Sequence, residues 1–248
     1  MWSSELLILV TATFLVAGTV KGVIGMALPT VALGVLAATL GLKEAIILML
    51  VPSFATNVWQ GLIGGRFLAL MKRLWSVLAA MLVGTWFATA ALVAGDTTVL
   101  EVLLGIVLVI YAVVGLAGRA LPAPGPHEPW LSPAMGGVTG VLAGLTGSTV
   151  MPIVPYLQSL GMSRDELIQA MGICFSTAAL GIGLALGGRN LFPPELGLLS
   201  AVGLLPAFAG MMFGQQLRKR LSEQHFKRVL FVSMALLGGY IALRAYLG

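Results

Sequence analysis

Long apolar runs, separated by short stretches that carry charge, glycine or proline, follow one another along the whole chain. They lie at about residues 5–40, 44–64, 73–95, 98–118, 132–160, 166–187, 196–216 and 229–247. A helix of about 20 apolar residues is long enough to cross the roughly 30 Å hydrocarbon core of a bilayer. The pattern therefore predicts an all-α polytopic membrane protein built from eight hydrophobic segments.

Composition supports the membrane class and excludes several others. Hydrophobic residues make up 58% of the chain and charged residues 9%, with a mean hydropathy of +1.01, whereas a soluble domain carries about 25% charge. The net charge of +5 is interpreted as a signal of membrane orientation, not of nucleic-acid binding. The single Cys174 excludes an intrachain disulfide, and no metal-ligand cluster or nucleotide phosphate loop predicts a cofactor. His127 and His225 lie in polar stretches, away from Ser148, so no enzyme is expected.

The two halves of the sequence carry the same glycine motif about 122 residues apart. The spacing Gly-x-x-x-Gly-x-x-Gly occurs at Gly18, Gly22 and Gly25 and again at Gly140, Gly144 and Gly147. A proline follows each motif, at Pro29 and Pro152. Two halves that each bear an apolar segment interrupted by glycine and proline are the sequence pointer to a transporter with its site between repeats. We predict repeats at residues 1–120 and 132–248, joined by a Pro-rich linker at 121–131, within one membrane domain.

The first segment of each repeat is expected to be broken. Residues 5–40 are too many for one ordinary crossing, glycine has low helix propensity, and Pro29 removes a helical hydrogen bond. We expect two half-helices with irregular backbone between them, as a re-entrant hairpin or as paired thin crossings. Such backbone lies at membrane depth only when it is buried in protein or lines a wet cavity. Tight helix packing through small residues is the alternative explanation of the glycines. The stretch 118–133, with five prolines, is not expected to continue a helix.

Basic residues predict the orientation. If both broken segments return to the side from which they came, ten of the 14 lysines and arginines share one side of the membrane. Lysine and arginine favour cytoplasmic loops, so we expect the linker and the basic loops inside and both termini outside. The two halves then have opposite orientation. The ten residues are Arg66, Lys72, Arg73, Arg119, Arg164, Arg218, Lys219, Arg220, Lys227 and Arg228.

The twin glycine motifs, their separation and the chain length resemble the sulfite exporter TauE/SafE family, also called the TSUP family of permeases. The resemblance covers nearly the whole chain and implies a bacterial inner-membrane permease for small sulfur-containing or organic anions. Sulfite, sulfoacetate and thiosulfate are the implied substrates. The chain departs from the family pattern because Met26, Ala27 and Leu28 replace the usual glycine-rich run, and because Lys21 lies inside the first motif.

Lys21 is the strongest single candidate for a residue that binds the substrate. A charge at the bilayer centre costs at least about 2.5–3.5 kcal/mol, so such a residue usually faces a cavity or a partner. No acidic residue lies in the middle of the same segment, and an anionic substrate would supply the partner. The alternative is a lysine that snorkels to the membrane interface.

The remaining candidates surround the two breaks. Gly22, Gly25, Gly144 and Gly147 would let backbone N–H groups approach an anion, and a half-helix after each break would direct its positive end there. Hydroxyl donors are expected from Thr146, Ser148 and Thr149, unless they bond back to their own helix. The next segments add Ser53, Asn57, Ser176 and Thr177, of which Asn57 either contacts substrate or joins helices.

These residues predict a secondary transporter that moves a small anion across the bilayer by alternating access. The acidic residues fall at segment ends, which favours export, because an inside-negative potential drives anions outward without a coupling ion. The alternatives are a channel-like anion conductor and a transporter of small organic carboxylates. A homodimer is left open.

Overall fold

The computed structural model describes residues 2–118, 121–189, 191–218 and 223–247, and within these ranges the chain is helical with no strand. Seven helical stretches are long and apolar enough to cross a membrane. The predicted all-α, multi-pass class is therefore confirmed. The elements are α1 (Ser4–Ile24), α2 (Leu28–Leu40), α3 (Leu42–Leu62), α4 (Phe67–Ala94), α5 (Thr97–Ala117), the 3-10 turn η1 (Gly125–His127), α6 (Glu128–Thr146), α7 (Ile153–Ser159), α8 (Arg164–Gly187), α9 (Pro194–Val202), α10 (Leu204–Leu217) and α11 (Glu223–Leu247).

Both long first segments are interrupted at the third glycine of the motif. Helix α1 ends at Gly25, which has φ 88° and donates its N–H to the Lys21 carbonyl at 2.7 Å. Helix α6 ends in the same way at Gly147, with φ 73° and an N–H bond to Ala143 at 2.8 Å. A left-handed residue after the last turn is the usual glycine stop of a helix. Whether either interrupted segment is re-entrant stays a prediction.

Helix ends differ from the expected segment ends where charge or proline falls inside a helix. Helix α4 begins at Phe67 and includes Lys72 and Arg73, because long basic side chains are tolerated in the first turns of a helix that starts at the membrane surface. Helix α6 begins at Glu128, so the expectation that residues 118–133 are non-helical is wrong for 128–133. Proline fits the first helical turn, where no N–H partner is needed, and Pro129 stands there. Among the residues used for orientation, Arg119, Lys219 and Arg220 lie outside the described residues.

The helices form two compact units, and each unit draws on both halves of the sequence. Unit 1 comprises Met1–Pro52, Thr97–Ala117 and Phe192–Gly248, and unit 2 comprises Ser53–Asp96 and Gly118–Leu191. The predicted repeats are thus interleaved in space, although their boundary in the sequence stays a prediction.

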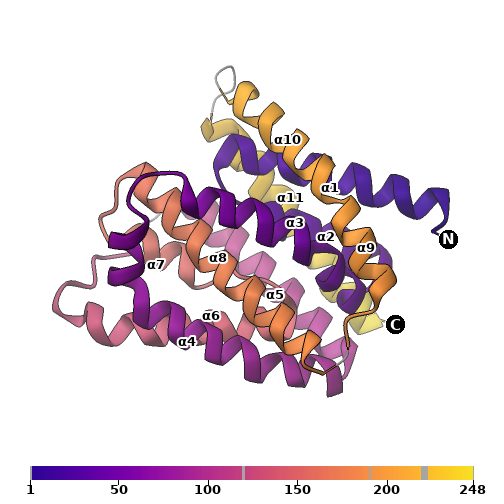
Figure 1. The fold of residues 1–248 in the computed structure, drawn as a ribbon, viewed down its shortest axis with the longest axis horizontal. Helices are drawn as coiled ribbons and strands as arrows, with labels where there is room; N and C mark the ends of the chain where they lie inside the picture. The colour runs from indigo at the N-terminus through magenta and orange to yellow at the C-terminus, as the bar shows by residue number, and fades with distance from the viewer. Residues whose placement is uncertain (1, 119–120, 190, 219–222, 248) are drawn as a thin grey trace. The chain divides into compact units, whose positions relative to one another are not determined.

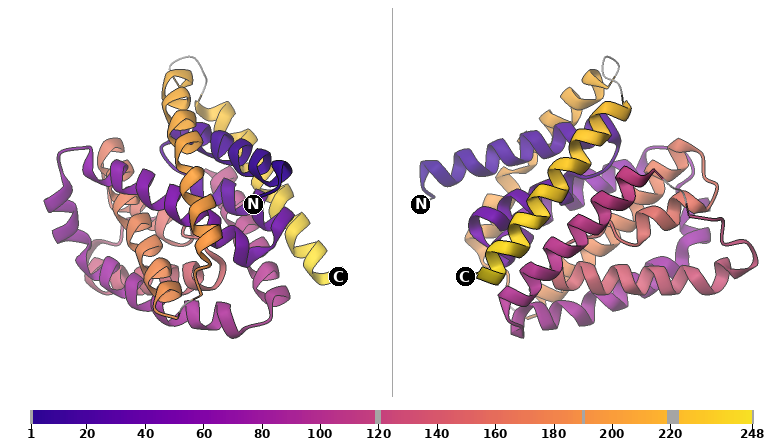
Figure 2. Two further views of the ribbon diagram at one scale, coloured as in Figure 1. Left: turned by 45° about the vertical axis from the view of Figure 1, so that its right-hand side comes forward. Right: turned by 180° about the vertical axis from the view of Figure 1, so that it is seen from behind.

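Unit 1 is organised around two helix pairs. Helix α1 crosses α10, as Figure 1 shows, and α5 runs beside α11, as the right-hand view of Figure 2 shows. Added side-chain carbons at Gly18 and Gly22 would clash with the backbone of Ala207 and Met211. From the first contact to the second, the residue number rises by four in each helix, so α1 and α10 run in the same direction where they cross. The glycines bring two helix backbones into direct contact, which is how small residues associate membrane helices.

Unit 2 repeats this arrangement with the roles of the halves exchanged. Helix α4 runs along α6 (Figure 1), and α8 packs on both. Gly136 and Gly140 of α6 meet the backbone of Val77 and Met81 of α4, so this pair is parallel as well. In each unit, the first helix of one half packs against the third segment of the other half. The reciprocal exchange supports the predicted repeats.

Helix α3 contains a proline that is accommodated by a side chain from another helix of unit 1. Pro52 has no N–H, so the Leu48 carbonyl four residues earlier loses its helical donor. The hydroxyl of Ser200, on α9, donates to that carbonyl at 2.7 Å and accepts the Val51 N–H at 3.1 Å. One buried hydroxyl thus satisfies two backbone groups beside the proline.

Candidate functional site

Lys21 lies in the last turn of α1, directly before the first break. Its side chain is only 2% exposed, so it is held inside the protein and does not extend to its surface. This burial disfavours the snorkelling alternative. Gly22 and Gly25 follow it, the first packed against α10 and the second in the left-handed turn that ends α1. Ala27, in the same break, also has a positive φ of 82°, a conformation that costs an L-residue about 1–2 kcal/mol.

The second break holds two buried hydroxyls without a partner. Ser148 and Thr149 are 2% and 5% exposed, and within the described part of the chain neither side-chain oxygen has a hydrogen-bond partner. The Thr146 hydroxyl, in contrast, donates to the Leu142 carbonyl at 2.7 Å and accepts the Ser148 N–H at 3.2 Å. Thr146 therefore holds the turn in shape, while Ser148 and Thr149 keep donors available.

The glycines of the second motif have different structural roles. Gly144 faces α4: an added side-chain carbon would lie 2.7 Å from the Thr85 carbonyl oxygen and 2.8 Å from the Thr89 nitrogen. Gly147 supplies the left-handed turn after α6. Packing thus accounts for Gly22 and Gly144, and helix termination for Gly25 and Gly147. Contact of their N–H groups with an anion stays a prediction.

The candidates on α3 and α8 are engaged within their own helices. The Asn57 amide donates to the Ser53 hydroxyl at 3.2 Å, and both side chains are buried. Ser176 and Thr177 donate to the carbonyls four residues earlier, at 2.7 and 3.0 Å. Back-bonding of this kind is the ordinary use of a helical hydroxyl. These four residues are all in unit 2, as are the second-break hydroxyls, whereas Lys21 belongs to unit 1.

Two glutamines join α3 to α8: sequence reasoning noted Gln60 beside Ser53 and Asn57 but missed its counterpart Gln169. Gln60 donates to the Ile168 carbonyl at 2.6 Å, and Gln169 donates to the Gly61 carbonyl at 2.8 Å. These two hydrogen bonds lie beside the close contact between α3 and α8, where an added carbon at Gly172 would be 2.6 Å from the Gly61 nitrogen. Amides near the ends of two apolar segments were the available signal, because an amide in the membrane usually bonds across helices.

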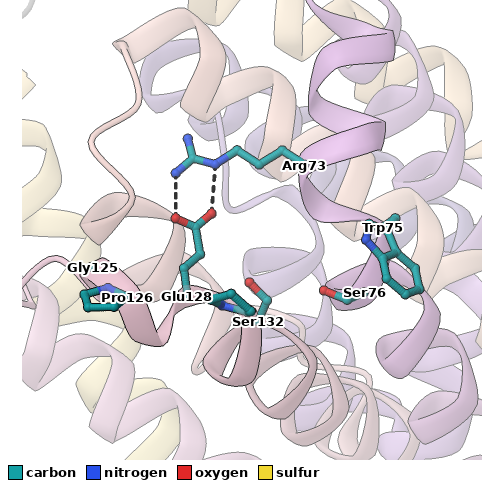
Figure 3. A pocket seen from close by; sticks show the side chains of 8 residues that line it. Arg73, Trp75, Ser76, Gly125, Pro126, Glu128 and Ser132 are labelled. Carbon is teal, nitrogen blue, oxygen red and sulfur yellow. Dashed lines mark hydrogen bonds and ion pairs between the residues drawn. The ribbon is translucent and has the colours of Figure 1, made fainter.

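An ion pair and a pocket at the beginning of α4 and α6 were also not foreseen. Arg73 forms two hydrogen bonds with Glu128, at 2.9 and 3.0 Å (Figure 3). It also donates to the Leu160 carbonyl at 3.3 Å. A bidentate pair of this kind has a fixed geometry, so it ties α4 and the start of α6 to the end of α7. The pocket beside it has a volume of about 470 Å³ and is lined by Arg73, Trp75, Ser76, Gly125, Pro126, Glu128, Pro129 and Ser132. None of the predicted ligands lines it.

Most carboxylates lie at the beginnings of helices, whereas Glu101 lies in the second turn of α5 and accepts the Leu42 N–H at 3.3 Å. Glu5, Glu44, Glu128 and Glu195 lie in first turns, as do Asp165 and Glu166, and Asp96 directly precedes α5. Acidic groups at a helix N-terminus are favoured by the helix dipole. Within the described ranges, no group of three or more His, Cys, Asp or Glu could hold a metal ion. The site chemistry that remains is a buried ammonium and buried hydroxyls.

Comparison with known families decides the class of protein. The sequence profile of the family described as sulfite exporter TauE/SafE matches residues 10–241, nearly the whole chain. The chain belongs to the TauE/SafE family. This confirms the resemblance seen in the glycine motifs, and it makes the chain a membrane transporter of sulfur-related anions in class. Comparison with curated proteins and with solved structures found no match.

Membership of the TauE/SafE family relates the buried polar groups to transport. Transport across a bilayer needs a small substrate and a protein that surrounds it, and multi-pass helices with buried polar groups at two breaks fit that need. The family is one of permeases and not of enzymes.

Proposed function

We propose that the chain is a secondary transporter that binds one small sulfur-containing anion, such as sulfite, thiosulfate or sulfoacetate. It moves this anion across the bacterial inner membrane by alternating access, with export favoured. The observation that carries the proposal is the pair of buried, unpartnered hydroxyls at Ser148 and Thr149, in a break of a chain that belongs to a sulfite exporter family.

An anion explains why these hydroxyls are retained. A buried donor without an acceptor costs about 1–3 kcal/mol, and a hydrogen bond to a charged acceptor contributes about 1.5–3 kcal/mol. The Thr146 hydroxyl, one turn away, is satisfied within its own helix, so the local backbone does not prevent pairing. The oxygens of a sulfur oxyanion are charged acceptors, and they would restore the missing bonds of Ser148 and Thr149 while substrate is bound.

Lys21 is the proposed source of positive charge. Lys21 is buried in unit 1, four residues before Gly25, the glycine that corresponds to Gly147 of the second break. A buried cation raises affinity for an anion because the low dielectric strengthens their attraction.

Charge and potential support export. The acidic residues at helix beginnings leave no carboxylate in the middle of the described spans to carry a coupling proton. An inside-negative potential supplies about 2.3 kcal/mol per 100 mV to a monovalent anion that leaves the cell. Outward movement thus proceeds without a coupling ion. The proposed orientation, with both termini outside and basic loops inside, follows from the distribution of lysine and arginine.

The test is flux of radiolabelled sulfite in proteoliposomes with an imposed membrane potential. The variants are Ser148→Ala combined with Thr149→Val, and Lys21→Met. Loss of two hydroxyl bonds to a charged ligand should lower the apparent affinity at least about a hundredfold. Thr139→Val is the matched control, because the buried Thr139 hydroxyl makes an ordinary 2.7 Å bond to Met135 in the same helix α6.

Four results separate the alternatives. Sulfite flux that saturates, and that falls in the double variant but not in the control, supports the carrier. Flux that never saturates favours a channel-like conductor. Wild-type protein that transports small carboxylates but no sulfur anion would overturn the substrate class, and unchanged flux in Lys21→Met would remove that residue as a ligand.

A further inference from the structure

A third unpartnered hydroxyl lies on α4 at Thr85. The residue is 0% exposed, and its side-chain oxygen has no hydrogen-bond partner within the described ranges. Its neighbours on the same helix pair behave differently. The hydroxyls of Thr89 and Thr139 donate to the carbonyls four residues earlier, at 2.8 and 2.7 Å. A bond of that type is open to any helical threonine, and Thr85 does not make it.

Close packing on two sides fixes the position of Thr85. Its carbonyl lies 2.7 Å from an added carbon at Gly144 of α6, and its Cβ and Cγ2 lie 3.0 Å from an added carbon at Gly181 of α8. Both neighbours are glycines: Gly144 of α6 lies against the Thr85 backbone, and Gly181 of α8 lies against its side-chain carbons. Valine has the same shape and would fill this space without a buried polar atom. The hydroxyl thus has no packing role that a methyl group could not serve.

The position of Thr85 relates it to the second break. Thr85 lies at the level of Gly144, in the last turn of α6, and Ser148 directly follows Gly147, the left-handed residue that ends this helix. Among the buried side-chain oxygens and nitrogens that the structure describes, only those of Thr85, Ser148 and Thr149 lack a partner. All three belong to unit 2. The unused donors are therefore concentrated where α4 packs beside the end of α6.

We propose that Thr85 is a third hydroxyl ligand of the transported anion, and that the site recognises a group with three oxygens on one sulfur. This inference rests on the proposed function and narrows its substrate class. Sulfite, thiosulfate and the sulfonate group of sulfoacetate each present three such oxygens, one for each hydroxyl donor. These three oxygens spread around the sulfur as a pyramid, so hydroxyls from α4 and from the break can each bond a separate oxygen. A carboxylate has only two oxygens, both in one plane, so it cannot offer a separate oxygen to each donor, and we expect the site to bind it more weakly.

The experiment measures binding of sulfite, methanesulfonate and acetate to purified full-length protein by calorimetry, together with thermal unfolding without ligand. Thr85→Val should bind sulfite and methanesulfonate about ten to a hundred times more weakly, the effect of one lost bond to a charged acceptor. Its unfolding temperature without ligand should equal or exceed that of the wild type, because a buried unpaired hydroxyl is removed. Thr85→Ser, which keeps the hydroxyl, should retain binding, and Thr89→Val is the control on the same helix.

The outcomes separate this inference from the proposed function. Equal sulfite affinity in wild type and Thr85→Val overturns the role of Thr85 and leaves the transporter proposal standing. Absence of binding by any sulfur anion to the wild type overturns both. Acetate that binds as tightly as methanesulfonate overturns the three-oxygen specificity. If the valine variant does not fold, Thr85→Ala carries the same expectation of weakened binding with a smaller side chain.

Discussion

The glycine at the contact between α4 and α6 allows the packing interpretation to be tested quantitatively. In Gly144→Ala the added carbon would lie 2.7 Å from both the Thr85 carbonyl oxygen and the Ala88 Cβ, whereas ordinary contact begins near 3.4 Å. The helices must separate by about 0.7 Å to admit it. A gap of 0.5–1 Å forfeits about a quarter to a half of the dispersion energy of a contact, and the loss extends along the pair because α4 and α6 touch over several turns.

Two opposing effects determine how Gly144→Ala changes the free energy of unfolding. Overpacking of a close contact typically costs about 1–3 kcal/mol, and replacing glycine by alanine inside a helix returns up to about 1 kcal/mol. Gly137→Ala isolates the second term, because it is in the same helix and its nearest foreign atom would be 4.0 Å away. Gly144→Ala should therefore be less stable than Gly137→Ala by about 1–3 kcal/mol.

The assay is equilibrium unfolding of the two variants and the wild type in the same detergent, followed by tryptophan fluorescence. Equal stability of Gly144→Ala and Gly137→Ala would refute the close packing of α4 on α6. Anion binding measured on the same samples decides the second question. Affinity that is unchanged in a folded Gly144→Ala would assign this glycine to packing alone and remove it from the predicted ligands.

Two further changes test contacts that hold the backbone. Ser200→Ala should lower stability by about 1–3 kcal/mol, because it strips the Leu48 carbonyl and the Val51 N–H of their shared partner beside the proline; Ser200→Thr should recover most of this loss in the same unfolding assay. Glu128→Gln removes one charge of the bidentate pair with Arg73, and since this pair is partly exposed, stability should fall by no more than about 1 kcal/mol. A loss of sulfite flux in Glu128→Gln at unchanged stability would show that the pair controls transport and contradict a purely structural role.

Much of the fold was predictable because membrane helices are specified locally. The apolar runs gave the helices within a few residues, and Gly25 and Gly147 marked both breaks, since glycine readily takes the left-handed turn that ends a helix. Predictions failed at proline. Position within the first turn decides whether proline is tolerated, and Pro129 occupies that turn. Spacing alone does not reveal where a helix begins.

Pairing between helices was not predictable from the sequence. The motif at Gly18 and Gly22 predicted a helix face suited to close packing. Its spacing does not identify Ala207 and Met211 as the surface that it contacts. Contacts between segments far apart in the chain depend on the whole fold. The same reason hid Ser200, whose partner is a carbonyl freed by a proline in another helix.

The candidate site was half predictable. Lys21 stood out because charge in an apolar run is costly, and Ser148 and Thr149 stood out beside a break. Thr85 did not, since one threonine among the apolar residues of α4 resembles any helical threonine that bonds to its own backbone. Only the absence of that bond distinguishes it.

The interleaving of the two halves sets an order of events during synthesis. Helix α6 begins about 34 residues after α4 ends, whereas α10 begins about 180 residues after α1 ends. At about 5–20 residues per second, α6 reaches α4 within roughly two to seven seconds, but α1 waits roughly nine to thirty-six seconds for its partner. Throughout that interval the glycine face of α1 lacks the helix against which it packs in the folded protein. Unit 1 can therefore complete its packing only after α10, in the last fifth of the chain, has been synthesised.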